Sequence, residues 1–195
     1  MPLNFNGAIM NKKVLYMTTI PVGIAINAIG GQIATFLNLP IFLDSIGTVL
    51  SGFLLGPVGG ALVGLFTNIL LGFILDPSYI PFSLVNIVIG IVSGFAAMKG
   101  GITLKNSIIV GLVLAILAPM VGTPIAVYLY GGLVGGGVDL LTAVFLHSGQ
   151  DIFSSAFLAR VPANLVDKLL SCVLVYYIIK PFPKDILSEL GVKIN

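Results

Sequence analysis

The polar stretch RVPANLVDKLLS, residues 160–171, interrupts the last long apolar run of this chain. Four of its polar residues recur at helical spacing: Arg160, Asn164, Asp167 and Ser171. On a helix these four residues form a polar stripe about 60° wide, with Lys168 on its flank. In a bilayer, each charge held near the midplane costs about 2.5–3.5 kcal/mol on insertion scales, so the stripe cannot face lipid. We predict that it faces the interior of a helix bundle.

The polar stripe has two interpretations. It can form the wall of a ligand-binding site in the outer half of its helix. It can also hold an internal ion pair, Asp167 with Lys168 or Arg160, that only joins helices. We favour the binding wall, because a stripe about three turns long exceeds what one ion pair needs.

Polar residues elsewhere in the chain are candidates for the same site. Asp44 either caps the N-terminus of a helix or accepts hydrogen bonds from a ligand. Asn68 and Asn86 lie deep in apolar runs, where asparagines serve either as contacts between helices or as ligand contacts. Three polar residues before the last helix form either an outer lid or a solvated loop face: His147, Gln150 and Asp151.

Small residues form a second stripe near the N-terminus. This small-residue stripe has the same angular spacing as the polar stripe and consists of Gly23, Asn27, Gly30 and Ala34. Small residues at this spacing let another backbone approach closely. The stripe therefore serves either for packing inside the bundle or for docking a second membrane protein, and the sequence leaves both interpretations open.

The elements that must position these residues are membrane helices. Hydrophobic residues make up 57% of the chain and charged residues only 8%, with a mean hydropathy of +1.14. Soluble domains carry about 25% charged residues. The net charge of +2 is too small to indicate a nucleic-acid partner, and the single cysteine, Cys172, cannot form a disulfide within the chain.

Charges, glycines and prolines divide the chain into six predicted spans: residues 14–37, 39–55, 57–75, 79–98, 106–130 and 161–180. A tight hairpin at Gly56-Pro57 joins the second span to the third. Pro119 and Pro124 are expected to kink or shorten the fifth. Residues 139–155 are too mixed to span and are expected to form an outer lid-like segment.

The positive-inside rule supports an even number of spans. With six spans, most basic residues fall on the cytoplasmic side: Lys12, Lys13, Lys99, Lys105, Lys180, Lys184 and Lys193. Five acids fall in the outer half or in outer loops: Asp44, Asp76, Asp139, Asp151 and Asp167. We therefore predict an all-α integral membrane protein, a compact bundle of six transmembrane helices that forms a single domain over residues 1–195, with both termini in the cytoplasm.

Catalysis finds no support in the sequence. His147 has no second histidine or cysteine nearby, so we assign no metal site. The chain has no phosphate-binding loop of the G-x-x-x-x-G-K-[ST] type, so it is not expected to hydrolyse ATP. We predict no cofactor and no enzymatic activity.

The layout resembles a known family. Six short helices, the block FLDSIGTVLSGFLLGPVGGALVGLFTNIL at residues 42–70 and the helix RVPANLVDKLL are similar to the substrate-binding S components of energy-coupling factor (ECF) transporters. The resemblance covers residues 14–183. It implies a multi-pass protein of the prokaryotic plasma membrane that binds a vitamin or related small molecule from outside. It also implies assembly with a transmembrane coupling subunit and two ATPase subunits.

The resemblance also indicates positions for the two sites. In the family the ligand pocket is built from the outer halves of helices four to six and the first outer loop. Carried over, these positions are Asp44, Asn86, Arg160, Asn164, Asp167 and Ser171. The family docks its coupling subunit through an alanine pair four residues apart on helix one. Here Gly30 and Ala34 have that spacing, with glycine in place of the first alanine.

The substrate class is an expectation from charge and aromatic content. Five outer acids against two basic residues favour a neutral or cationic ligand over a strongly anionic one. Aromatic residues near the outer side can stack on a heterocycle: Phe42, Tyr79, Phe82, Tyr128 and Tyr130. A vitamin-like or nucleoside- or nucleobase-like molecule fits these features. The alternative is a stand-alone secondary transporter of a small polar solute, which would need duplicated halves with interrupted helices.

Overall fold

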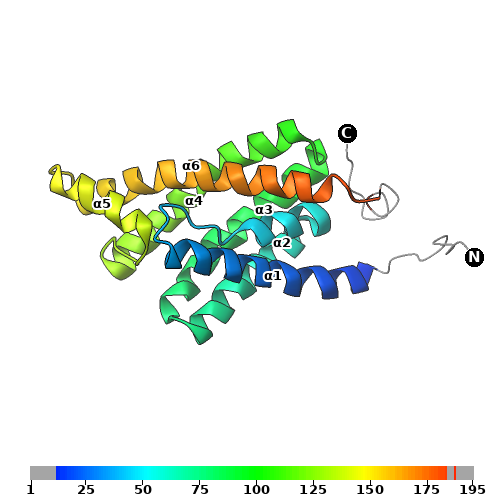
Figure 1. The fold of residues 1–195 in the computed structure, drawn as a ribbon, viewed down its shortest axis with the longest axis horizontal. Helices are drawn as coiled ribbons and strands as arrows, with labels where there is room; N and C mark the ends of the chain where they lie inside the picture. Colours follow the sequence, from blue (N-terminus) through cyan, green and yellow to red (C-terminus); the bar gives the residue numbers. More distant parts are fainter. Residues whose placement is uncertain (1–11, 184–186, 188–195) are drawn as a thin grey trace, which may run out of the picture.

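The computed structural model describes residues 12–183 and residue 187, and in this part of the chain all regular elements are helices (Figure 1). They are α1 (Lys12–Phe36), α2 (Ile46–Ile74), the 3-10 helix η1 (Pro77–Phe82), α3 (Ser83–Gly100), α4 (Leu104–Tyr130), α5 (Gly137–His147) and α6 (Ile152–Ile179). Five helical segments are long and apolar enough to cross a membrane: α1, α2, η1 together with α3, α4, and α6.

Helix α2 is a hairpin of two helical arms. Gly56 interrupts it with non-helical dihedrals, φ 80° and ψ −174°. The Asn27 side chain donates hydrogen bonds to both Thr48 and Thr67, at 2.8 and 3.0 Å. In a straight helix these two threonines would lie about 28 Å apart, at 1.5 Å per residue. The arms therefore lie side by side, and the predicted hairpin at Gly56-Pro57 is confirmed.

Glycines allow the α2 arms and α3 to touch through their backbones. A Cβ added at Gly90 would collide with the backbone of Gly60, and one added at Gly94 would collide with the backbone at Gly56 and Pro57. Small residues permit this close approach where lipid offers no hydrophobic force to drive helices together. The glycine-rich block of the sequence is thus the interface between the hairpin and α3.

Asn27 ties α1 to the beginning of α2. Its side-chain oxygen accepts hydrogen bonds from the backbone N–H groups of Gly47 and Thr48, at 2.7 and 3.3 Å. The first N–H groups of a helix have no partner within the helix, and the residue before α2, Ser45, makes no side-chain cap. Asn27 therefore supplies the cap from another helix, while its amide nitrogen bonds Thr48 and Thr67 on the two arms.

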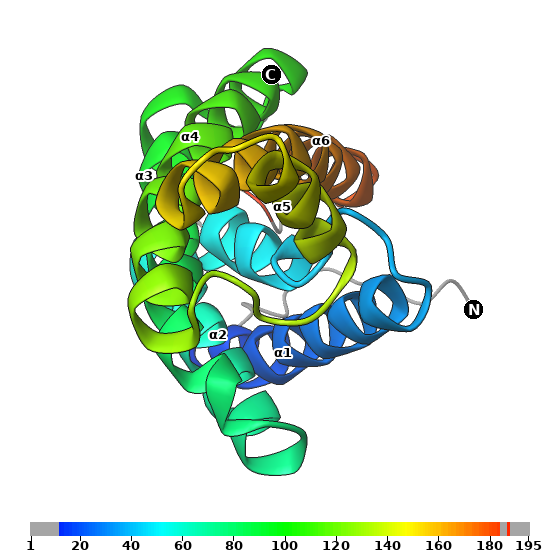
Figure 2. The ribbon, with the colours of Figure 1, turned by 90° about the vertical axis from the view of Figure 1, so that its left-hand side faces the viewer.

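The two ends of the bundle are formed by different elements. The beginning of α1 and the end of α6 lie at the same end of the bundle (Figure 1). At that end the Tyr16 hydroxyl donates to the carbonyl of Leu55, beside the hairpin turn. At the opposite end, α5 and the loop of residues 131–136 cross over the bundle (Figure 2).

The second helix is shorter than predicted. The predicted span 39–55 is helical only from Ile46, because residues 37–45 form turns and extended backbone. Two non-glycine residues in this segment have positive φ, Asn38 at 50° and Leu43 at 54°. The first arm of the hairpin is therefore too short to cross a bilayer by itself, and the residues just before it, 41–45, are partly or fully buried.

The last two predicted helices also differ in their bounds. Helix α6 begins at Ile152, well before predicted residue 161, because the Asp151 side chain caps it by accepting hydrogen bonds from the N–H groups of Phe153 and Ser154. Helix α4 continues through both Pro119 and Pro124 to Tyr130.

Candidate functional site

A cavity of about 350 Å³ lies at the end of the bundle that carries α5. Its wall combines the end of α1, the loop before α2, the end of α2, η1, α3, α4, the glycine-rich loop before α5, and α6. Small-molecule sites have volumes of about 300–1,000 Å³ and mostly apolar walls with a few placed polar groups. This cavity has that size and that composition.

Four of the six predicted substrate-binding residues line the cavity: Asp44, Asn86, Arg160 and Asn164. Other polar residues in the wall include Asn68, Asp76 and Lys168. The whole polar stripe is buried, with 0–4% of each residue exposed. The prediction that this stripe faces the bundle interior is therefore confirmed, and two of its four residues, Arg160 and Asn164, line the cavity.

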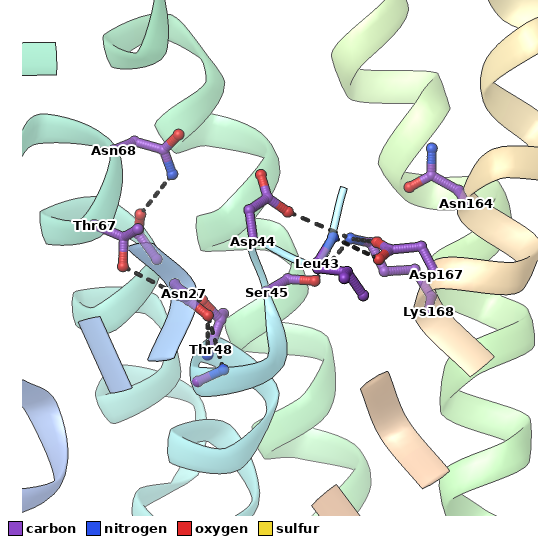
Figure 3. Close-up of polar contacts among 12 residues, drawn as sticks. Asn27, Leu43, Asp44, Ser45, Thr48, Thr67, Asn68, Asn164, Asp167 and Lys168 are labelled. Carbon is purple, nitrogen blue, oxygen red and sulfur yellow. Dashed lines mark hydrogen bonds and ion pairs between the residues drawn. The ribbon is translucent and has the colours of Figure 1, made fainter. Parts of the chain in front are cut away.

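Asp167 has a different position from the one expected, since it is completely buried and does not line the cavity. Its carboxylate accepts a hydrogen bond from the backbone N–H of Leu43 at 2.8 Å and forms an ion pair with Lys168 (Figure 3). Lys168 also donates to the Ser45 hydroxyl at 2.7 Å and lies 3.9 Å from the Asp44 carboxylate. Asp167 and Lys168 together attach the loop before α2 to α6.

All five outer carboxylates have partners within the protein. Asp44 and Asp167 flank Lys168, and the other three accept backbone N–H groups. Asp139 accepts from Val134 and Gly135, Asp76 from Ser78, and Asp151 from Phe153 and Ser154. Hydrogen bonds from Ser78 and from Ser154 lower the pKa of Asp76 and of Asp151, so both are ionised at neutral pH.

The partners of the outer acids bear on how the charge of the cavity is counted. Three of these carboxylates hold loops or helix ends, and the other two, Asp44 and Asp167, flank one lysine. The charge of the cavity has to be judged from the cavity-lining groups that lack a partner.

Two of those groups are found on α6 and α3. Within the described part of the chain, the guanidinium of Arg160 donates one hydrogen bond, from Nη1 to the Ala156 carbonyl at 3.3 Å, and its Nη2 has no hydrogen-bond partner there. Among the described residues, no carboxylate lies within 4.0 Å of Arg160. On α3, the side-chain oxygen of Asn86 is likewise buried without a partner. One turn along α6, Asn164 donates to the Arg160 carbonyl at 2.9 Å.

Aromatic rings form part of the cavity wall. Phe82, Tyr79 and Phe42 line it, and the Phe82 ring stacks on Tyr130 with centroids 6.0 Å apart and planes inclined by 20°. Phe42 also lies beneath the ammonium group of Lys168, 5.9 Å from the ring centroid. The arrangement offers flat apolar surfaces close to the polar groups of α6.

A glycine-rich loop closes one side of the cavity. Residues 134–138 all line it, and four glycines in the loop before α5 have positive φ: Gly131, Gly132, Gly135 and Gly136. Asp139 holds this loop by accepting hydrogen bonds from the N–H groups of Val134 and Gly135, at 2.9 and 2.6 Å. The glycine-rich loop thus forms part of the cavity wall, whereas residues 139–155, the predicted lid-like segment, do not line the cavity.

Several predicted residues lie elsewhere. Ser171 is completely buried and does not line the cavity. Among the described residues its hydroxyl has no hydrogen-bond partner. His147, Gln150 and Asp151 are exposed and do not line the cavity, which favours a solvated loop face over a lid.

The small-residue stripe of α1 faces the inside of the bundle. Asn27 is completely buried, a Cβ on Gly23 would meet the Ser51 hydroxyl at 2.7 Å, and a Cβ on Gly30 would collide with the Leu43 carbonyl. Ala34 lines the cavity. This burial favours packing over docking. The outward face of α1 carries large apolar residues instead: Met17, Val22, Ile29 and Ile33.

Several cavity residues are not among the site residues predicted from the sequence. Lys168 lies on the flank of the predicted stripe, and the glycine-rich loop belongs to no predicted site. Pro119 and Gly122 inside α4 form part of the wall. Of these residues, only Lys168 could have been recognised from the sequence, because a charge within an apolar run requires a partner.

In the described residues, no group of three or more His, Cys, Asp or Glu side chains could hold a metal ion.

Comparison with known proteins gives the decisive result for this chain. A family model described as "ECF transporter, substrate-specific component" matches residues 15–179. The chain belongs to this family.

Membership in the ECF substrate-specific component family agrees with the long apolar helices and the cavity. This S component is a multi-pass membrane protein that binds substrate for an ECF transporter and is not an enzyme. No curated protein and no solved structure matches the chain significantly.

Proposed function

We propose that this S component captures a small vitamin-like, nucleoside-like or nucleobase-like molecule from outside a prokaryotic cell and passes it to a transmembrane coupling subunit. Two separate ATPase subunits supply the energy. The observation that carries the proposal is a cavity of about 350 Å³, with convergent polar groups, in a chain of this family.

The distribution of charge supports an outward-facing cavity. Lys13 at the beginning of α1 and Lys180 after α6 lie at the end of the bundle away from the cavity. Lys99 belongs to the same end, because its neighbour Met98 lies beside Gly56 at the hairpin turn. Lysines near span ends mark the cytoplasmic side, so the cavity opens outward and both termini are cytoplasmic.

Six passes of the chain follow from this orientation, with the α2 hairpin counted as two. The first arm is completed by the loop of residues 37–45. Non-helical backbone at membrane depth is tolerated where it is buried in protein. Here Asp167 and Lys168 hold the loop against α6 through Leu43 and Ser45.

A ring-containing substrate fits the wall of the cavity. Phe42, Tyr79 and Phe82 present aromatic faces, and Asn86 and Asn164 present amides that can read donor and acceptor positions. Stacking on aromatic rings combined with a few hydrogen bonds is a common way to bind flat heterocycles.

Affinity purification from native membranes tests the proposal. We expect a tagged chain to bring down one further multi-pass subunit and two ATPases, and the reconstituted complex to accumulate substrate only with ATP. Mass spectrometry of compounds released by denaturing the purified protein would name the substrate. Ion-gradient-driven uptake by the chain alone would instead establish the secondary transporter.

A further inference from the structure

One buried charge in the wall of the cavity forms no ion pair within 4.0 Å among the described residues. Four charged residues line it: Asp44, Asp76, Arg160 and Lys168. Lys168 is held by Asp167 and Asp44, and Asp76 is an exposed cap that accepts the N–H of Ser78. Arg160 is 3% exposed and its Nη2 has no hydrogen-bond partner. Buried ions are normally paired, because removing a charge from water is costly.

Arg160 is placed where its unpaired guanidinium can contact a ligand in the cavity. Arg160 lies on the polar stripe in the wall of the cavity, one turn from Asn164. Its side chain makes a single, long hydrogen bond back to its own helix, at 3.3 Å to Ala156. Asp139 is the carboxylate that acts on Arg160 electrostatically. Its Oδ2 accepts two backbone N–H groups of the glycine-rich loop, and its Oδ1 is buried without a hydrogen-bond partner among the described residues. Asp139 forms no ion pair with Arg160 within 4.0 Å among the described residues.

We propose that the substrate carries a carboxylate that binds the guanidinium of Arg160, with its ring or apolar body against the aromatic wall. A planar carboxylate accepts two parallel N–H bonds from a guanidinium, which is the geometry that this side chain is built to donate. The unpartnered oxygen of Asn86 then takes an N–H or O–H donor of the same molecule.

Charge balance favours a carboxylate over a phosphate. One free guanidinium offsets one negative charge, whereas a phosphate monoester near neutral pH carries more than one. Lys168 cannot supply a second positive charge, because Asp167 and Asp44 already flank it. The substrate is therefore a small organic acid with one carboxylate, and this inference rests on the proposed ligand-binding function of the cavity.

Thermal unfolding of the purified full chain in detergent, with benzoate and benzamide as matched probes, tests the inference. The two probes have the same shape and differ in charge. We expect benzoate to raise the midpoint of unfolding in a saturable way and benzamide to raise it much less. In Arg160→Gln the difference between the probes disappears. Leu158→Ala, an exposed position on the same helix that does not line the cavity, keeps the difference between them.

Folding of the variants is checked independently. Because Arg160 is an unpaired buried charge without ligand, Arg160→Met should unfold at the same or a higher temperature than the unliganded wild type. A purely structural arginine would give the opposite result, a lower midpoint in both variants without any probe.

The inference would be overturned if benzoate and benzamide raised the unfolding midpoint equally, or if neither raised it. It would also be overturned if benzoate still raised the midpoint more than benzamide in Arg160→Gln. Inorganic phosphate could also match benzoate at equal concentration, which would assign Arg160 to phosphate or to a lipid headgroup. None of these outcomes touches co-purification with a coupling subunit and ATPases, so the carboxylate inference and the proposed transport function can fail separately.

Discussion

The carboxylate of Asp167 on α6 accepts a hydrogen bond from the backbone N–H of Leu43 at 2.8 Å, across 124 positions of sequence. Leu43 has a positive φ of 54°, a conformation that costs a non-glycine residue energy and that surrounding contacts must maintain. Through this bond the last helix determines the shape of the loop that carries Asp44 to the cavity.

The first prediction concerns this connection. Asp167→Asn keeps the size of the side chain but leaves Lys168 with only the more distant Asp44, and breaking a buried ion pair costs about 3–5 kcal/mol. We expect a clearly lower midpoint of thermal unfolding in detergent. A second variant, Asp167→Leu combined with Lys168→Met, should recover much of the loss, because it removes both charges. An unchanged midpoint in the single variant would show that the pair is not important for the loop.

The second prediction concerns the cap that α1 provides for α2. Asn27→Ala removes an acceptor for the N–H groups of Gly47 and Thr48, and each buried group left without a partner costs about 1–3 kcal/mol. We expect a substantial fall in the unfolding midpoint. Thr18→Ala on the same helix is the matched control, since Thr18 is exposed and bonds only within α1. Equal effects of the two changes would contradict the role of Asn27.

The third prediction compares two helical glycines. A Cβ at Gly90 collides with the backbone of Gly60, whereas a Cβ at Gly122 has its closest contact with Val85 at an ordinary 3.4 Å. Gly90→Ala should therefore destabilise the protein by about 1–3 kcal/mol through overpacking. Gly122→Ala should be neutral or should stabilise α4 by up to about 1 kcal/mol through helix propensity. Denaturant titration monitored by circular dichroism measures both.

The fourth prediction separates packing from docking on α1. The side chain of Gly30→Leu would collide with the Leu43 carbonyl and displace the loop that carries Asp44. We expect this variant to lose thermal stability and to release less bound small molecule on denaturation, even in the absence of a coupling subunit. Ile29→Ala, on the exposed face, is the control and should keep both properties. If Gly30→Leu affects only co-purification of the coupling subunit, docking through this stripe is correct.

Much of the architecture was predictable from local chemistry. The charge pattern of residues 160–171 required an inward-facing stripe, because charges facing lipid are costly. Gly56-Pro57 predicted the hairpin, since glycine adopts the positive φ that the turn requires. The bounds of the helices were less predictable. Asp151 extends α6 by capping it, and the loop of residues 37–45 replaces helix because α6 binds its backbone.

The sequence by itself determined that this is a membrane bundle with a polar interior at one end, because hydropathy and the cost of exposed charge act on any arrangement of the helices. Only the tertiary structure decided which charges remain free. Asp44 and Asp167 flank Lys168, Asp139 holds the glycine-rich loop, and Arg160 has no ion-pair partner within 4.0 Å among the described residues. Such pairing depends on distances between residues far apart in the chain, and composition does not contain those distances.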